Sequence, residues 1–153
     1  MIDHLDHLVL TTDDEVACID FYTRVLGMRL KVFQAGSPPM PRRAFLFGAQ
    51  KINLHVKGSE FAPKAHLPVP GSQDWCFIAS VPLAEVIDRL NAADWPIIEG
   101  PVMRTGATRA IRSVYVARSS SSSHPVTSYF QQSIRNLEQS TNQPSGFLVW
   151  NTK

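Results

Sequence analysis

The sequence predicts an α+β fold in which one βαβββ unit is used twice in tandem. An apolar, strand-like run at residues 5–11 is matched 68 positions later, and the same offset relates the helix-like stretches around Ile19 and Ile87. A constant offset through strands and helices alike indicates one supersecondary unit used twice. The repeat fails only where the second copy should end, near residue 123, because five consecutive serines stand at 119–123.

The first unit shows clear start and stop signals. Thr12 followed three residues later by Glu15 has the form of a capping box, which predicts that a helix begins there. The apolar residues that follow recur at helical spacing, and Gly27 is a natural helix stop. Alternating or apolar runs predict four strands around this helix, at residues 5–11, 28–34, 43–47 and 51–56.

The second unit repeats this order after a proline-rich linker at 61–72. Pro82 suits the first turn of a helix, and Leu83, Val86 and Leu90 mark its buried face. Residues 103–108 are expected to form a loop. The expected strands of this unit are 74–80, 96–102 and 111–116.

The last part of the chain is expected to differ from the rest. We expect one domain at 1–117, made of units 2–57 and 73–117, and an irregular Ser-rich tail at 118–153. Residues 118–142 are predicted to be poorly ordered, because they offer little apolar surface to offset the entropy of ordering. Weak helical spacing between residues 129 and 137 favours a short helix, and 146–151 is a candidate last strand.

Composition excludes several function classes. The chain of 153 residues carries a net charge of only +2, and its basic residues are scattered, which argues against nucleic acid as a partner. No apolar run approaches the ~20 residues of a membrane span. The first residues show no secretory signal, and the two cysteines form no disulfide framework. A cytoplasmic location is therefore expected.

Several motifs resemble those of the vicinal oxygen chelate superfamily, the group of glyoxalases, fosfomycin-resistance proteins and extradiol dioxygenases. The likeness covers roughly residues 2–116. Within the superfamily it is most specific for proteins of the glyoxalase domain-containing 5 type. It is carried by IDHLDHLVL at 2–10, DFYTRVLGM at 20–28, QKINLH at 50–55, PGSQD at 70–74, EGPVMRTGAT at 99–108 and IRSVYV at 111–116.

This resemblance implies a cupped mixed sheet with a divalent metal ion in the cup. Ligands in the family come from the first and last strands of each unit, which assigns His7 and His55 as metal ligands. Imidazoles suit Zn, Ni, Co, Fe or Mn. The equivalent first-strand position in the second unit is expected to hold Trp75, which has no lone pair for a metal. Two protein ligands alone make a weak site.

The glutamate that usually completes such a site is missing after Val116. The sequence offers two candidate replacements for this glutamate. Residues 146–151 could form the last strand, with Trp150 in place of the glutamate, or His124 could act as a ligand. The remaining alternative is a C-terminal sequence that does not complete the site.

Arg104 and Tyr115 are the candidate substrate-binding residues, because a guanidinium binds carboxylate or phosphonate groups and Tyr115 is expected to face the cup. The sequence thus predicts a glyoxalase-like protein whose intact relatives act on a small oxygenated metabolite as metal-dependent lyases, isomerases or dioxygenases. In this chain we expect impaired catalysis. The alternative is a non-catalytic protein that binds a small ligand on the same fold. A homodimer is the expected assembly.

Overall fold

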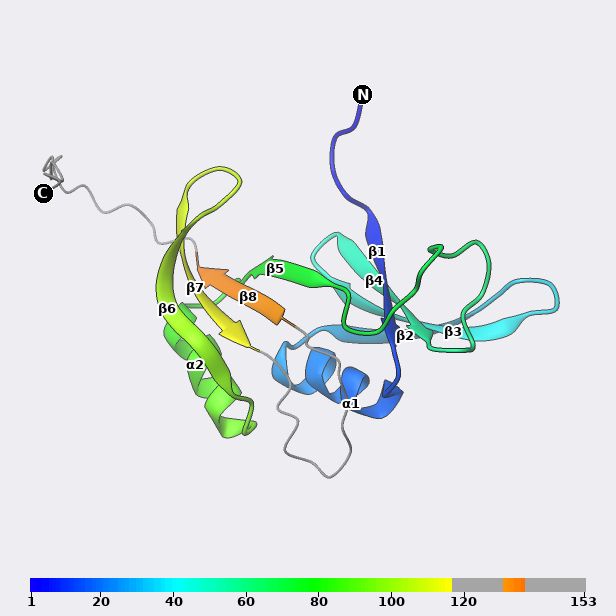
Figure 1. Ribbon diagram of the computed structural model, residues 1–153, viewed down its shortest axis with the longest axis horizontal. Coiled ribbons are helices and arrows are strands. Elements are labelled where there is room, and N and C mark those ends of the chain that lie inside the picture. The colour runs from blue at the N-terminus through cyan, green and yellow to red at the C-terminus, as the bar shows by residue number, and fades with distance from the viewer. Residues whose placement is uncertain (117–130, 137–153) are drawn as a thin grey trace, which may run out of the picture.

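The computed structural model describes residues 1–116 and 131–136, and its first unit is a four-stranded mixed sheet with one helical segment (Figure 1). The strand order is β1-β4-β3-β2, with β1 parallel to β4 and the other neighbours antiparallel. In chain order the elements are β1 (His7–Thr12), α1 (Glu15–Asp20), the π-helical turn η1 (Phe21–Val25), β2 (Arg29–Ala35), β3 (Met40–Phe47) and β4 (Gln50–Val56).

The second unit has the same topology, with strand order β5-β8-β7-β6 and β5 parallel to β8. The prediction of an α+β fold built from two βαβββ units is therefore confirmed. The elements of this unit are β5 (Asp74–Ile78), α2 (Leu83–Ala92), β6 (Ile97–Thr105), β7 (Ala110–Val116) and β8 (Gln131–Asn136).

The last strand of the second unit, β8, lies where the sequence predicted a short helix within a poorly ordered segment. It pairs with β5 on one side and β7 on the other, so its backbone groups are bonded on both edges. His7 pairs with Lys51, 44 positions later, whereas Trp75 pairs with Gln132, 57 positions later. The chain between the first and last strands is therefore longer in the second unit than in the first. The predicted strand at 146–151 and His124 lie outside the described residues.

The first helix starts two residues later than the capping box predicted. Asp14 is its N-cap, and the Asp14 carboxylate accepts a hydrogen bond of 3.0 Å from the backbone N–H of Ala17. The Thr12 hydroxyl instead bonds to the backbone of Asp14, at 3.1 Å. Gly27 follows the helical segment with φ of 71°, which confirms the predicted stop, since glycine adopts this left-handed conformation without strain.

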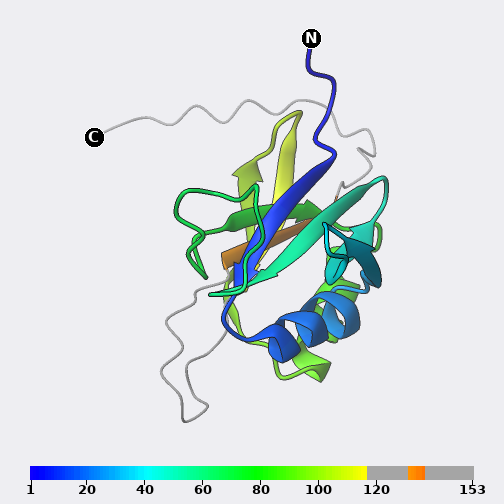
Figure 2. The same cartoon turned by 90° about the vertical axis from the view of Figure 1, so that its right-hand side faces the viewer.

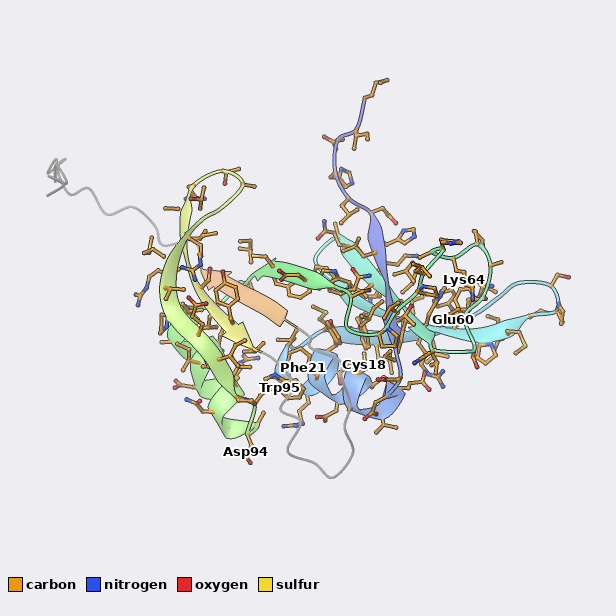
Figure 3. All side chains as sticks on the ribbon, viewed as in Figure 1. Cys18, Phe21, Glu60, Lys64, Asp94 and Trp95 are labelled. Atoms are coloured by element: carbon orange, nitrogen blue, oxygen red, sulfur yellow. The ribbon has the colours of Figure 1, made fainter. Side chains whose placement is uncertain are left out.

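One hydrophobic core joins the two units. It gathers buried side chains from both helices and from both sheets. Phe21 of η1 stacks on Trp95, just after α2, with ring centroids 4.2 Å apart (Figure 3). Tyr22 stacks on Phe45 of β3 at 4.7 Å. Figure 2 shows α1 lying below the strands of its own sheet, so the core fills the space between helices and strands.

Candidate functional site

The two faces of the first sheet follow from its strand register. Leu10 of β1 pairs with Leu54 of β4, and both belong to the core, so that face packs on the helices. The residues between them point to the opposite face, because side chains alternate along a strand. We call this second face the cup face. Its members on β1 and β4 are His7, Val9, Thr11, Lys51, Asn53 and His55.

His7 and His55 therefore share the cup face, but the structure does not bring them together. His7 pairs with Lys51, whereas His55 pairs with Thr11, four register positions further along. Four positions correspond to about 13 Å along the strands. Two imidazoles on one metal ion need their ligating nitrogens within about 4 Å, since each Zn–N bond is about 2.0–2.1 Å.

His7 is the first residue of β1 and is partly exposed to solvent. Its side chain is 43% exposed, and its Nδ1 lies 2.6 Å from a carboxylate oxygen of Asp6. This hydrogen bond from the imidazole lowers the pKa of the Asp6 carboxyl group. His7 is thus engaged by its sequence neighbour rather than by a group on another strand.

His55 is the most deeply buried histidine among the described residues, at 2% exposure. Its ring packs on Phe61 of the linker, with centroids 3.9 Å apart, and its Nδ1 has no hydrogen-bond partner in the described parts of the chain. Burial lowers the pKa of His55, and the nearby charges of Arg42 and Lys64 lower it further, while Glu60 opposes them. Burial of His55 thus disfavours its charged form.

The residues that the structure describes do not fit the metal site that the family resemblance implied. No group of three or more His, Cys, Asp or Glu side chains that could hold a metal ion occurs within residues 1–116 and 131–136. His7 and His55 are separated along the sheet, and catalytic metal sites in proteins usually have three protein ligands. The assignment of either histidine as a metal ligand stays a prediction.

The first-strand position in the second unit belongs to Asp74, not to Trp75. Trp75 is 8% exposed and points into the core, where its ring lies 6.3 Å from that of Tyr22 and its Nε1 donates to Gln73 at 3.0 Å. Trp75 therefore corresponds to a leucine of β1 that points towards the core, and not to His7. A shift of one residue moves every side chain of a strand to the other face. The exposed Asp74 is thus the counterpart of His7.

Arg104 and Tyr115 do come together, on neighbouring strands of the second sheet. The sequence predicted a loop at 103–108, but β6 continues to Thr105 and places Arg104 opposite Ile111. Arg104 Nε donates to the Tyr115 hydroxyl at 3.0 Å, and its guanidinium also pairs with Glu99. These hydrogen bonds raise the pKa of Arg104. The guanidinium is thus already engaged within the protein, and its role in substrate binding stays a prediction.

A pocket of about 770 Å³ lies between the two units. Apolar side chains dominate its walls, including Phe47 and Phe77, whose rings meet edge to face at 5.5 Å. Its polar lining includes His4, Gln50, Cys76, Ser80 and Arg89, and its remaining apolar lining includes Val25, Leu26, Met28, Ile78, Val81 and Val86.

Comparison with known proteins decides the family. The family model described as the Glyoxalase/Bleomycin resistance protein/Dioxygenase superfamily matches residues 4–116. The chain belongs to this superfamily. The superfamily-level resemblance seen in the sequence is therefore confirmed, while the narrower likeness to the glyoxalase domain-containing 5 type stays a prediction.

Two glyoxalase-superfamily relatives illustrate the match. Virulence protein STM3117 of Salmonella typhimurium is 49% identical over 116 residues, which cover 76% of this chain and 77% of that protein. Its crystal structure superimposes with a TM-score of 0.77, covering 89% of this chain and 98% of the other. Glyoxalase domain-containing protein RDO1 of Mycosarcoma maydis is 51% identical over 112 residues, which cover 73% of this chain but only 60% of RDO1.

An integron cassette protein from V. Cholerae has a similar structure, with a TM-score of 0.77 and 40% sequence identity over 89% of this chain and 96% of that one. Sequence reasoning missed two side chains that the structure places near His55: the ring of Phe61 packs on His55, and the guanidinium of Arg42 lies over the same Phe61 ring. The doublet Arg42-Arg43 on an alternating strand was the available signal, because it sends one arginine to each face.

Proposed function

We propose that this chain is a small-molecule-binding member of the glyoxalase superfamily with little or no metal-dependent activity of the glyoxalase kind. The observation that carries the proposal is the pocket of about 770 Å³ between the two units. Ligand pockets for small molecules commonly measure about 300–1,000 Å³ and combine apolar walls with a few polar groups. The ligand that fits this chemistry is largely apolar, with an aromatic or aliphatic body.

The walls of the pocket suit an aromatic ring in particular. Phe47 and Phe77 already meet edge to face, and a third ring can add to such a pair at centroid distances of about 4.5–7 Å. The guanidinium of Arg89 also belongs to the pocket lining, where it already pairs with Glu85 at 2.7 Å.

Impaired catalysis follows from the arrangement of the cup face. His7 and His55 lie four register positions apart, and no third candidate ligand joins either of them within the described ranges. Without a positioned metal ion an enzyme of this kind forfeits several kcal/mol of Lewis-acid stabilisation. A weak or absent rate is therefore the expected result for hemithioacetal and related oxygenated substrates.

The binding proposal is tested with the fluorescent probe 8-anilinonaphthalene-1-sulfonate and the thiol of Cys76. Cys76 is exposed and lines the pocket, whereas Cys18 is buried. Saturable binding of one probe per folded chain is expected, and alkylation of Cys76 by N-ethylmaleimide should abolish it. In the Cys76→Ser variant the reagent should have no effect. Unsaturable binding, or binding that survives alkylation of Cys76, contradicts the assignment of this pocket.

The enzymatic alternative is favoured by one observation: the first-strand position of the second unit holds a carboxylate, Asp74, instead of the indole of Trp75. Calorimetric titration with Zn, Ni, Co, Fe and Mn in turn, followed by turnover assays with a hemithioacetal, separates the two functions. Robust, chelator-sensitive turnover that disappears in His55→Ala would establish a metal-dependent enzyme and overturn the proposal of impaired catalysis.

The remaining expectations concern location and assembly. No helix among the described residues is long and apolar enough to span a membrane. Cytoplasmic location and a homodimer stay predictions. Sedimentation analysis of the purified chain tests the homodimer. Several apolar side chains before β1 and in the linker, such as Leu5, Leu67 and Val69, are exposed and would suit such a contact.

A further inference from the structure

The linker that follows β4 folds back onto the cup face of the first sheet. The ring of Phe61 packs on His55 with centroids 3.9 Å apart, and the Cζ atom of Arg42 lies 3.6 Å from the centroid of the same ring. Arg43 pairs with Leu54 in the register, so Arg42 and His55 are neighbours across the β3–β4 ladder. One linker ring therefore covers two adjacent polar side chains that belong to different strands.

The linker leaves β4 through a turn at Gly58. The Ser59 N–H donates to the Val56 carbonyl at 2.9 Å, and no backbone hydrogen bond joins residues 60–66 to either sheet within the described chain. Gly58 has φ of 80°, and a Cβ atom there would meet nothing within 4 Å. Glycine adopts this conformation freely, and such positions absorb the rotation when a segment swings. Gly58 can therefore act as a hinge for the residues that follow it.

An ion pair holds the residues after the hinge together. Glu60 pairs with Lys64 at 3.1 Å and accepts a hydrogen bond from the backbone N–H of Gly58, also at 3.1 Å (Figure 3). Both of these partners belong to the linker and neither to a strand, so the two interactions can persist when the segment leaves the sheet. We call residues 58–64 the lid.

The closed lid leaves two polar atoms under Phe61 without a partner. Arg42 Nε and His55 Nδ1 are buried and have no hydrogen-bond partner in the described parts of the chain. A buried polar atom without a partner costs free energy of the same order as one aromatic or cation–π contact contributes. Because water would satisfy both atoms once the ring moves away, the contacts of Phe61 are partly offset. The closed position is thus favoured by a small margin only.

From these contacts we infer that the lid opens and closes over the cup face, with Gly58 as its hinge and Phe61 as the side chain that closes it. In the closed position Phe61 occupies the space over His55 and Arg42, so a small molecule reaches this part of the face only in place of the ring. The apparent affinity of such a molecule falls in proportion to the fraction of chains whose lid is open. The lid therefore controls access to the cup face independently of the strands that form it.

The lid is separate from the pocket between the units. None of residues 58–64 lines that pocket. Phe47, which does, points to the opposite face of β3 from Arg42, because five residues separate them on one strand. Alkylation of Cys76 should therefore leave the lid unaffected, and the two proposals can fail independently.

The test is the rate at which diethyl pyrocarbonate modifies His55 in the full chain, measured by peptide mass spectrometry in slightly alkaline buffer, where exposed imidazoles are neutral. His7, whose side chain is 43% exposed, is the internal reference. Phe61→Ala should raise the His55 rate about tenfold and leave the His7 rate unchanged, since it removes one aromatic and one cation–π contact. Leu67→Ala is the matched control, because this linker side chain is exposed, and it should change the His55 rate by less than about twofold.

Cys18 distinguishes opening of the lid from unfolding of the domain. Its thiol is buried in the core, so N-ethylmaleimide reaches it only when the domain itself opens. The protection of each group is its modification rate in the urea-unfolded chain divided by its rate in the folded chain. In the wild-type chain His55 should be at least about tenfold less protected than Cys18, as expected for local opening at a smaller free-energy cost than unfolding. In Phe61→Ala the protection of Cys18 should persist.

Three results would overturn the inference. Equal protection of His55 and Cys18 in the wild-type chain would show that His55 is reached only through unfolding. An unchanged His55 rate in a folded Phe61→Ala chain would show that this ring does not close the lid. An equal rise in Leu67→Ala would show that the whole linker has loosened. The wild-type comparison decides the matter even if Phe61→Ala does not fold.

Discussion

The imidazole ring of His55 packs against the phenyl ring of Phe61, with the two centroids 3.9 Å apart. Through this contact the linker between the units is fastened to the last strand of the first sheet. The guanidinium of Arg42 lies over the same phenyl ring at 3.6 Å. One linker side chain thus joins two strands and partly closes the cup face.

Phe61→Ala should lower the free energy of unfolding by about 1–2 kcal/mol, the combined size of one aromatic pair and one cation–π contact. Urea unfolding followed by circular dichroism measures the change. Phe61→Leu is the matched control, because it keeps an apolar side chain but removes the ring, and it should lose less. A change below about 0.3 kcal/mol in Phe61→Ala would show that the linker is not fastened there.

Stability should fall in acid because of His55. Burial lowers the pKa of His55 in the folded state below its ordinary value of 6.5. Between the two pKa values the unfolded chain binds more protons, so the free energy of unfolding rises with pH in that window. The stabilisation is fully present above about pH 6.5 and is lost as the pH falls through the lowered pKa.

The pH dependence can be assigned by variants. His55→Gln should flatten this part of the stability profile, measured by urea unfolding at a series of pH values, while His66→Gln, at an exposed linker position, should not. The charges that act on His55 are Glu60, Arg42 and Lys64, and all three are retained in both variants. Identical profiles for His55→Gln and the wild type would contradict a buried neutral histidine.

Asp14→Ala should destabilise the protein by about 1 kcal/mol, since an N-cap carboxylate is lost. Asp14 accepts from the backbone N–H of Ala17 at 3.0 Å. Asp13→Ala is the control, because Asp13 is exposed and is not the cap of α1. Thermal melts of the two variants should therefore differ, and equal melting temperatures would mean that the cap contributes nothing.

Sequence reasoning predicted the architecture well because periodicity and helix signals are local. Cys18 and Tyr22 on the first helical segment are buried like Val86 and Leu90 on α2, each pair 68 positions apart, as the repeat required. The late last strand could not be predicted, since a strand paired on both sides is held by backbone hydrogen bonds and tolerates a polar sequence such as Gln131–Asn136.

The candidate site was less accessible to sequence reasoning, because strand register is a tertiary property. The separation of His7 and His55 along the sheet appears only when each is paired with its partner on the neighbouring strand. The role of Phe61 was equally hidden, since a linker residue carries no periodic signal that shows which strand it will cover.

The counterpart of His7 in the second unit can be tested directly. If Asp74 is that counterpart, Asp74→His should leave stability within about 0.5 kcal/mol, as is usual for exposed positions. Trp75→His should cost about 3 kcal/mol, because it removes a buried indole that packs near Tyr22 and Phe77 and leaves a polar ring in the core. Any gain in Zn or Ni affinity should come from Asp74→His, since Asp74 points away from the core on its own sheet, as His7 does on the first sheet, whereas Trp75 is buried. Calorimetric metal titration and urea unfolding of both variants show which residue corresponds to His7. A stable Trp75→His protein with increased metal affinity would mean that Trp75, not Asp74, is the counterpart of His7.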